Sequence, residues 1–146
     1  MVQGQTCTVD MYVANDQSGS VSSVENAQSR QFISALMTNL QPWGTAPGES
    51  RMAIADWDYA WSWTAFSFPV AGQNYTTLLA DVVAYQNAPR YLFGGTDPYD
   101  ALLRTYQNID QTPIPGRAAK RTIVLMTDAD CSQVPSGISF LASQIK

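Results

Sequence analysis

The chain has 146 residues, of which 45% are hydrophobic and 14% are charged, and its formal net charge is −4. This length supports one domain with a sizeable core, and the hydrophobic fraction excludes a disordered tail. The acidic balance argues against a nucleic-acid partner, because no surplus of basic side chains is available to displace counterions from phosphates.

The first half of the chain alternates strand and helix patterns. The predicted elements are, in order, a strand over 8–14, a helix over 21–40, a loop over 41–50, and strands over 51–57 and 62–68. The helix is indicated by hydrophobic residues at helical spacing, namely Ile33, Leu36, Met37 and Leu40. The last two strands are separated by only four residues, which favours an antiparallel hairpin. We expect the hairpin aromatics to cover the core rather than to form a sugar-binding platform: Trp57, Tyr59, Trp61 and Trp63.

The second half predicts helices over 75–86, 97–109 and 135–145, with a strand over 121–128 before the last of them. The helix over 97–109 has a clear start, since Asp97 suits the N-cap and Pro98 the first turn. Its expected buried stripe comprises Tyr99, Leu102, Tyr106 and Ile109. The apolar centre of the strand is typical of a parallel strand that is covered on both faces.

Strands that alternate with helices predict an α/β fold in which helices cover both faces of a mostly parallel sheet. Ligands of such sheets bind at the carboxyl ends of the strands. Asp16 ends the first predicted strand, Asp128 ends the strand over 121–128, and Thr96 follows two glycines just before a helix. We therefore expect these three side chains to meet at one rim of the sheet.

An all-oxygen set of side chains is predicted at this rim. Two serines follow Asp16 at alternate positions, so the set comprises Asp16, Ser18, Ser20, Thr96 and Asp128. The sequence contains no histidine, which excludes the usual nucleophile-histidine triads and the commonest zinc ligand. A metal held here must be a hard cation bound by oxygen, and Mg²⁺ suits such a set. An ion held in this way can accept one more oxygen from a partner's carboxylate.

At these residues the chain resembles the von Willebrand factor type A domain family with its metal-ion-dependent adhesion site. The family pattern is Asp-x-Ser-x-Ser, then a Thr, then an Asp; here it is matched by DQSGS over 16–20, GGTD over 94–97 and MTDAD over 126–130. The resemblance spans residues 8 to 145, and the predicted order of elements also follows the family.

The resemblance implies a single domain over 1–146 with a Rossmann-like three-layer sandwich, a mostly parallel sheet and one antiparallel edge strand. It implies a non-enzymatic adhesion module, extracellular or on the cell surface, that binds a protein or matrix ligand through Mg²⁺, Mn²⁺ or Ca²⁺. A glutamate or aspartate of that ligand would complete the metal shell. Ser18, Ser20 and Thr96 would be direct or near-direct ligands, and Asp16 and Asp128 would act directly or through water.

The chain departs from the family at the third motif and in length. Ala129 stands where the family has glycine, and Asp130 adds a carboxylate that we expect to face solvent. Family members continue with further strands and helices, so the fold implied here is truncated after the fourth strand and its helix. Either the chain is a fragment, or another segment or chain completes the sheet. We expect a further segment to pair beside residues 121–128, because an open parallel edge recruits strands.

The two cysteines are expected to stay unbonded to each other. Cys7 precedes the first strand and Cys131 follows the fourth, so parallel strands place them at opposite rims. A strand of this length separates the rims by about 20 Å, whereas a disulfide needs Cα atoms within about 7 Å.

Other functions remain open at this stage. The domain can be a structural subunit of a filament or surface layer in which the metal stabilises a loop, or an intracellular type A domain that works with an ATPase. A magnesium-dependent phosphohydrolase also places an aspartate at the end of its first strand, but it needs a second acid where this chain has Ser18. The serines beside Asp16 can also belong to a helix cap and a polar loop.

Overall fold

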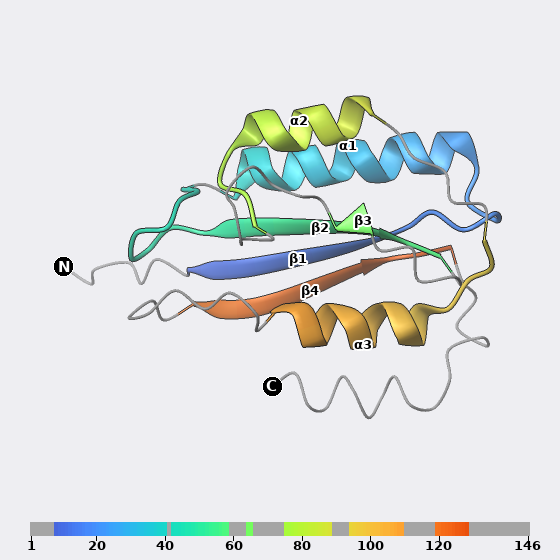
Figure 1. Cartoon of the computed structure of the whole chain (residues 1–146). Helices are drawn as coiled ribbons and strands as arrows, with labels where there is room; N and C mark the ends of the chain where they lie inside the picture. Colours follow the sequence, from blue (N-terminus) through green and yellow to red (C-terminus); the bar gives the residue numbers. More distant parts are fainter. Residues whose placement is uncertain are drawn as a thin grey trace.

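The computed structural model describes residues 8–40, 42–58, 64–65, 75–88, 94–109 and 119–128. These ranges form an α/β fold in which an open sheet lies between helices (Figure 1). The elements are β1 (Val9–Asp16), α1 (Ser23–Asn39), β2 (Arg51–Trp57), β3 (Thr64–Ala65), α2 (Leu79–Asn87), α3 (Pro98–Ile109) and β4 (Lys120–Met126). Outside the described residues lie both cysteines, Asp130, the expected helix over 135–145, and most of the expected strand over 62–68.

The sheet has the strand order β3-β2-β1-β4. β1 pairs in parallel with both β2 and β4, whereas the short β3 runs antiparallel to β2. In this register Asp16 lies opposite Trp57 on β2, and Asn15 lies opposite Met126 on β4. The three parallel strands consequently end side by side at one rim.

Helices α1 and α2 cover one face of the sheet, and α3 covers the other (Figure 1). The larger core lies under α1 and α2 and consists of Met11, Val13, Ile33, Met37, Met52, Ile54, Val82 and Tyr85. On the α3 side, Ala14 and Trp57 pack against Ala101. The expectation that the hairpin aromatics cover the core is thus confirmed for Trp57, and the other three aromatics lie outside the described residues.

None of the described helices is long and apolar enough to cross a membrane.

Helix α1 begins with a capping box. The Ser22 hydroxyl accepts a hydrogen bond from the Glu25 backbone N–H at 3.3 Å, and the Glu25 carboxylate accepts one from the Ser22 N–H at 2.8 Å. Of the four hydrophobic residues expected to face the core, Ile33 and Met37 are buried and Leu36 is partly buried, but Leu40 is 45% exposed. Leu40 comes after the last helical residue, so its side chain leaves the buried face.

The helix expected over 75–86 begins later, at Leu79. Tyr75 and Thr76 are instead part of an extended segment, in which the backbone N–H and C=O of Thr76 bond to Met52 at 2.6 and 2.9 Å. Tyr75 is buried on the sheet, and the Arg51 guanidinium lies 4.0 Å from its ring centroid. Pairing with β2 therefore overrides the helical pattern at this point.

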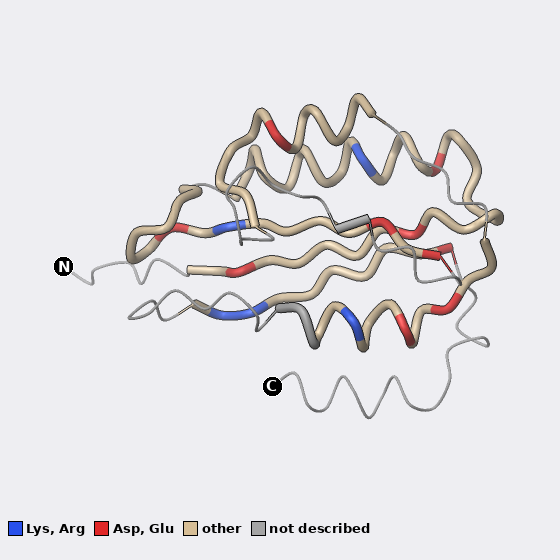
Figure 2. The backbone as a smooth tube through the Cα atoms, viewed as in Figure 1, with Lys and Arg blue, Asp and Glu red and all other residues tan. Residues whose placement is uncertain are grey.

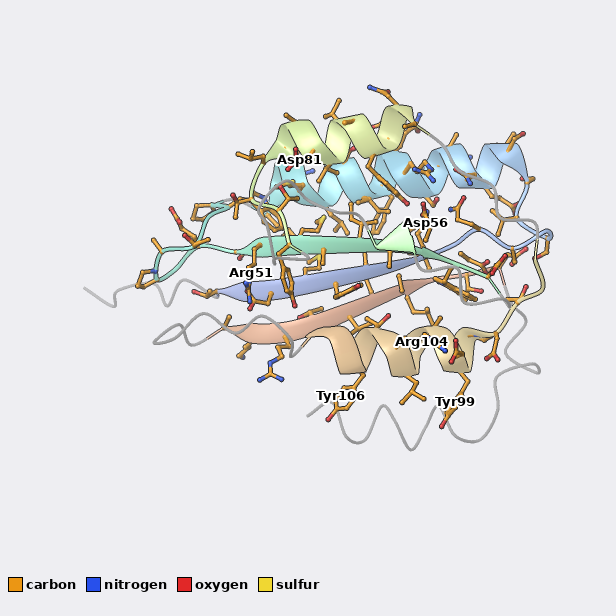
Figure 3. The ribbon with its side chains drawn as sticks, viewed as in Figure 1. Arg51, Asp56, Asp81, Tyr99, Arg104 and Tyr106 are labelled. Carbon is orange, nitrogen blue, oxygen red and sulfur yellow. The ribbon has the colours of Figure 1, made fainter. Side chains whose placement is uncertain are left out.

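The expected buried stripe of α3 is wrong in two positions. Tyr99 and Tyr106 are half-buried, and Figure 3 shows both pointing away from the sheet. The face toward β1 and β4 is formed by Ala101, Leu102 and Thr105. Two of these three buried positions carry small side chains, whereas the large aromatic rings lie on the other side of the helix. The side chain of Ile109 is outside the description.

Strand β4 is less enclosed than its sequence indicates. Residues 122–126 are half-buried, and among the described residues β4 has β1 as its only strand neighbour. The prediction that the strand is covered on both faces is therefore only partly met. The open edge is where we expect a further segment to pair.

Candidate functional site

The predicted oxygen ligands lie in three loops at the carboxyl rim of the sheet. The loop after β1 begins with a tight connection to β2, because the Gln17 N–H donates to the Trp57 carbonyl at 2.8 Å. The segment before α3 brings Thr96 to the same rim, and Asp128 lies two residues past the end of β4. Figure 2 shows acidic positions gathered at this end of the sheet.

The structure brings all five predicted side chains together in one hydrogen-bonded chain. The Thr96 hydroxyl donates to the Ser18 hydroxyl at 2.9 Å, and the Ser18 and Ser20 hydroxyls are 3.0 Å apart. The Ser20 hydroxyl in turn donates to the Asp128 carboxylate at 3.0 Å. Asp16 joins this chain through the backbone N–H of Ser18, which donates to its Oδ1 at 2.8 Å. Side chains from three separate loops are therefore linked by hydrogen bonds at one rim.

Asp16 is the buried carboxylate of the set, and Asp128 is the exposed one. Burial raises the pKa of the Asp16 carboxyl, and the negative charge of Asp128 raises it further. Hydrogen bonds from Thr127 and Ser18 act in the opposite direction and lower it. Keeping Asp16 ionised beside a second carboxylate is therefore costly, and a cation placed between them would remove that cost.

Thr127 is a site residue that the sequence reasoning missed. Its hydroxyl donates to Asp16 Oδ2 at 2.6 Å, so both oxygens of the buried carboxylate have a donor. Thr127 directly precedes Asp128, and its position after the last residue of β4 is the signal that could have identified it. By holding Asp16, it joins the ends of the neighbouring strands β1 and β4.

The donor set fits a hard divalent cation. It offers two carboxylates and three hydroxyls, which are the oxygen ligands that Mg²⁺ and Ca²⁺ take. Among the described residues no group of three His, Cys, Asp or Glu side chains could hold a metal ion, and the predicted ligand set itself contributes two carboxylates. An ion held by only two negative charges can still attract an anionic ligand. The predicted set contains no nitrogen or sulfur ligand, which disfavours zinc.

A cavity of about 470 Å³ opens directly beside the site. Asp16, Thr127 and Asp128 form part of its wall, and α1 contributes Glu25 and Phe32 on the other side. The carboxylates therefore border open space, and a partner group has room to approach them.

The sequence matches no protein-family model, and no curated protein is significantly similar to it. The function is therefore inferred from the residues and their geometry alone.

Proposed function

We propose that this chain is a metal-dependent binding domain of the von Willebrand factor A type, with Mg²⁺ or Mn²⁺ held by Asp16, Ser18, Ser20, Thr96 and Asp128. The observation that carries the proposal is the continuous series of hydrogen bonds that links all five residues, with Asp16 joined through the backbone N–H of Ser18. The five residues come from loops far apart in the sequence. A polar loop or a helix cap alone would not require Thr96 and Asp128 to join the serines.

The metal would supply a Lewis-acidic position for a carboxylate oxygen of the partner. Hydroxyl ligands are neutral, so the ion keeps most of its charge and attracts such an oxygen strongly. Asp16 and Asp128 balance the charge, and the backbone N–H of Ser18 and the hydroxyl of Thr127 orient Asp16. We propose a protein or matrix ligand with an exposed Glu or Asp as the partner, and no catalytic step.

The same fold leaves the edge of β4 open among the described residues. We propose that another segment, from the same protein or from a partner chain, pairs with this edge. Such pairing would complete the mainly parallel, Rossmann-like sheet that the proposed family has, and it would cover the half-buried residues of β4.

Calorimetric titration with Mn²⁺ and Mg²⁺ tests the metal site. Both ions should bind the wild-type chain and raise its thermal midpoint by mass action, and a chelator should reverse this. Asp128→Ala should abolish binding while leaving the fold intact, because Asp128 is exposed and contributes no core packing. Thr96→Ala should weaken binding with little loss of stability, and Zn²⁺ should show no preference over Mg²⁺.

Glu49→Gln is the matched control, since it removes one carboxylate charge from the loop before β2, at the opposite rim of the sheet. It should leave metal binding unchanged. Acetate then tests the open coordination position: it should lower the water-proton relaxivity of bound Mn²⁺, whereas chloride at equal ionic strength should not. A wild-type chain that binds no divalent ion, or an Asp128→Ala variant that binds it normally, would refute the proposed site.

A further inference from the structure

A third acidic residue lies at the same rim and is not part of the predicted ligand set. Asp58 is the first residue after β2, and its side chain is buried, with 4% of the residue exposed. Its carboxylate accepts a hydrogen bond from the backbone N–H of Gly94 at 3.2 Å. Taking a charge out of water is costly, so a carboxylate that is buried against the backbone of a loop is expected to have a specific structural role.

The backbone of Gly94 connects Asp58 to both ligand-bearing loops, because its N–H and its carbonyl are both hydrogen-bonded. Gly94 lies two residues before Thr96, and its carbonyl accepts a hydrogen bond from the Gly19 N–H at 2.8 Å. Gly19 lies between Ser18 and Ser20. Asp58 therefore accepts from the N–H of Gly94, while the carbonyl of the same residue is bonded directly to the other loop. The two loops then meet again through the hydroxyls of Thr96 and Ser18.

The contact between Asp58 and Gly94 leaves no space for a side chain. A Cβ atom at Gly94 would lie 2.3 Å from the Asp58 Oδ2 atom and 3.2 Å from its Cβ atom. Glycine is therefore needed at this position for the close approach of the carboxylate to the backbone. Any residue larger than glycine must displace either the Asp58 side chain or the segment that carries Thr96.

We infer that Asp58 is a positioning residue for the metal site. It fixes the backbone of Gly94, and in this way it sets the distance between Thr96 and the two serines. This inference rests on the proposed function. Magnesium requires oxygen ligands at about 2.0–2.1 Å in near-ideal geometry, so a small displacement of one ligand loop weakens binding. Outer partners that orient metal ligands typically contribute about 10- to 100-fold to metal affinity.

Asp58 acts through the Gly94 peptide rather than as a further metal ligand. Within the described ranges Asp16, Asp58 and Asp128 do not form a group of three acids around one point. The carboxylate of Asp58 is directed at the Gly94 backbone instead. The site therefore requires an oxygen at this position that accepts from the Gly94 N–H, and it does not require a negative charge.

Titration with Mn²⁺ of wild-type, Asp58→Ala, Asp58→Asn and Gly94→Ala chains tests this role. Asp58→Ala and Gly94→Ala should each raise the Kd for Mn²⁺ about tenfold or more. Asp58→Asn should stay within about threefold of wild type, because the amide oxygen still accepts from the Gly94 N–H. Asp100→Ala, which removes a half-buried carboxylate from α3, is the control and should bind as wild type does.

Unfolding of every variant in a chelator separates positioning from folding. A residue that only stabilises the fold would lower the metal-free midpoint and leave the Kd of the folded fraction unchanged, and that result for Asp58→Ala would overturn the inference. An Asp58→Asn variant as weak as Asp58→Ala would also overturn it, since a charge would then be required. Failure of the wild-type chain to bind Mn²⁺ would refute the proposed function as well, whereas the other two outcomes leave the proposed function standing.

Discussion

Replacing Arg30 by methionine should strongly destabilise the fold, because it leaves a buried carboxylate without its counter-charge. Arg30 lies on α1 and is 1% exposed, and its Nη2 atom is 3.2 Å from the Asp56 carboxylate, which is also fully buried. Its Nε donates to Asn26 Oδ1 at 2.7 Å, and its Nη1 donates to the Tyr85 carbonyl at 2.8 Å. Figure 3 shows Asp56 between the sheet and α1, and none of the residue is exposed to solvent.

The expected loss is about 3–5 kcal/mol in the free energy of unfolding, the usual result of breaking a buried pair by removing one partner. Methionine keeps the length and most of the apolar stem of arginine, so the loss reports the missing charge and donors rather than a cavity. Arg104→Met is the matched control. Arg104 pairs with Asp100 at 2.6 Å on the outside of α3, and this partly exposed pair should contribute less than about 1 kcal/mol.

The loss should also depend on pH. Burial raises the pKa of the Asp56 carboxyl, although the charge of Arg30 and hydrogen bonds from Tyr85 and Asn15 lower it. When the folded chain holds a proton more tightly than the unfolded chain, the stability due to that group is full at low pH and is lost as the pH rises through the folded pKa. Without Arg30 that pKa rises further, so the deficit of Arg30→Met should be largest near neutral pH and should shrink on acidification.

Urea denaturation followed by circular dichroism, in a chelator and between about pH 5 and pH 7, measures both effects. The double variant Arg30→Met with Asp56→Asn should recover most of the loss, because no buried charge then remains. The reasoning would be refuted if Arg30→Met lost no more stability than Arg104→Met, or if its deficit grew on acidification.

Two further predictions concern the core and the open edge. Ile33→Ala should lower the free energy of unfolding by about 2–5 kcal/mol, because Ile33 is fully buried on the core-facing side of α1. Val24→Ala on the exposed side of the same helix should cost less than about 0.5 kcal/mol. Equal losses in urea denaturation would contradict the observed orientation of α1. Backbone amides of residues 123–126 should exchange slowly with deuterium at alternate positions, where β4 pairs with β1, and at all positions once a further segment is bound. Fast exchange throughout this stretch would contradict the pairing of β4 with β1. A well-behaved monomer in which the remaining amides of this stretch exchange fast would count against the proposed pairing with a further segment.

Much of the fold could be predicted because its causes are local in the sequence. The bounds of β2 are those expected, Arg51 to Trp57, since a run of apolar residues is bounded there by polar and turn-forming ones. Asp97 caps α3 as expected, with its carboxylate accepting from the Asp100 N–H at 3.0 Å. The meeting of Asp16 with Asp128 could also be predicted, because the carboxyl ends of parallel strands reach the same rim whatever lies between them.

The tertiary structure decided everything that depends on pairing across long separations. No local pattern indicates that Arg30 and Asp56 form a buried ion pair, since each is an ordinary polar residue in its own segment. The contact of Asp58 with Gly94 joins residues 36 positions apart, and it becomes visible only when β2 and the segment before α3 reach the same rim. Local sequence sets which backbone conformation a segment prefers and which face it buries. Which polar group meets which is set by the packing of strands and helices against one another, because a buried donor, acceptor or charge is stable only beside a partner that the whole fold delivers.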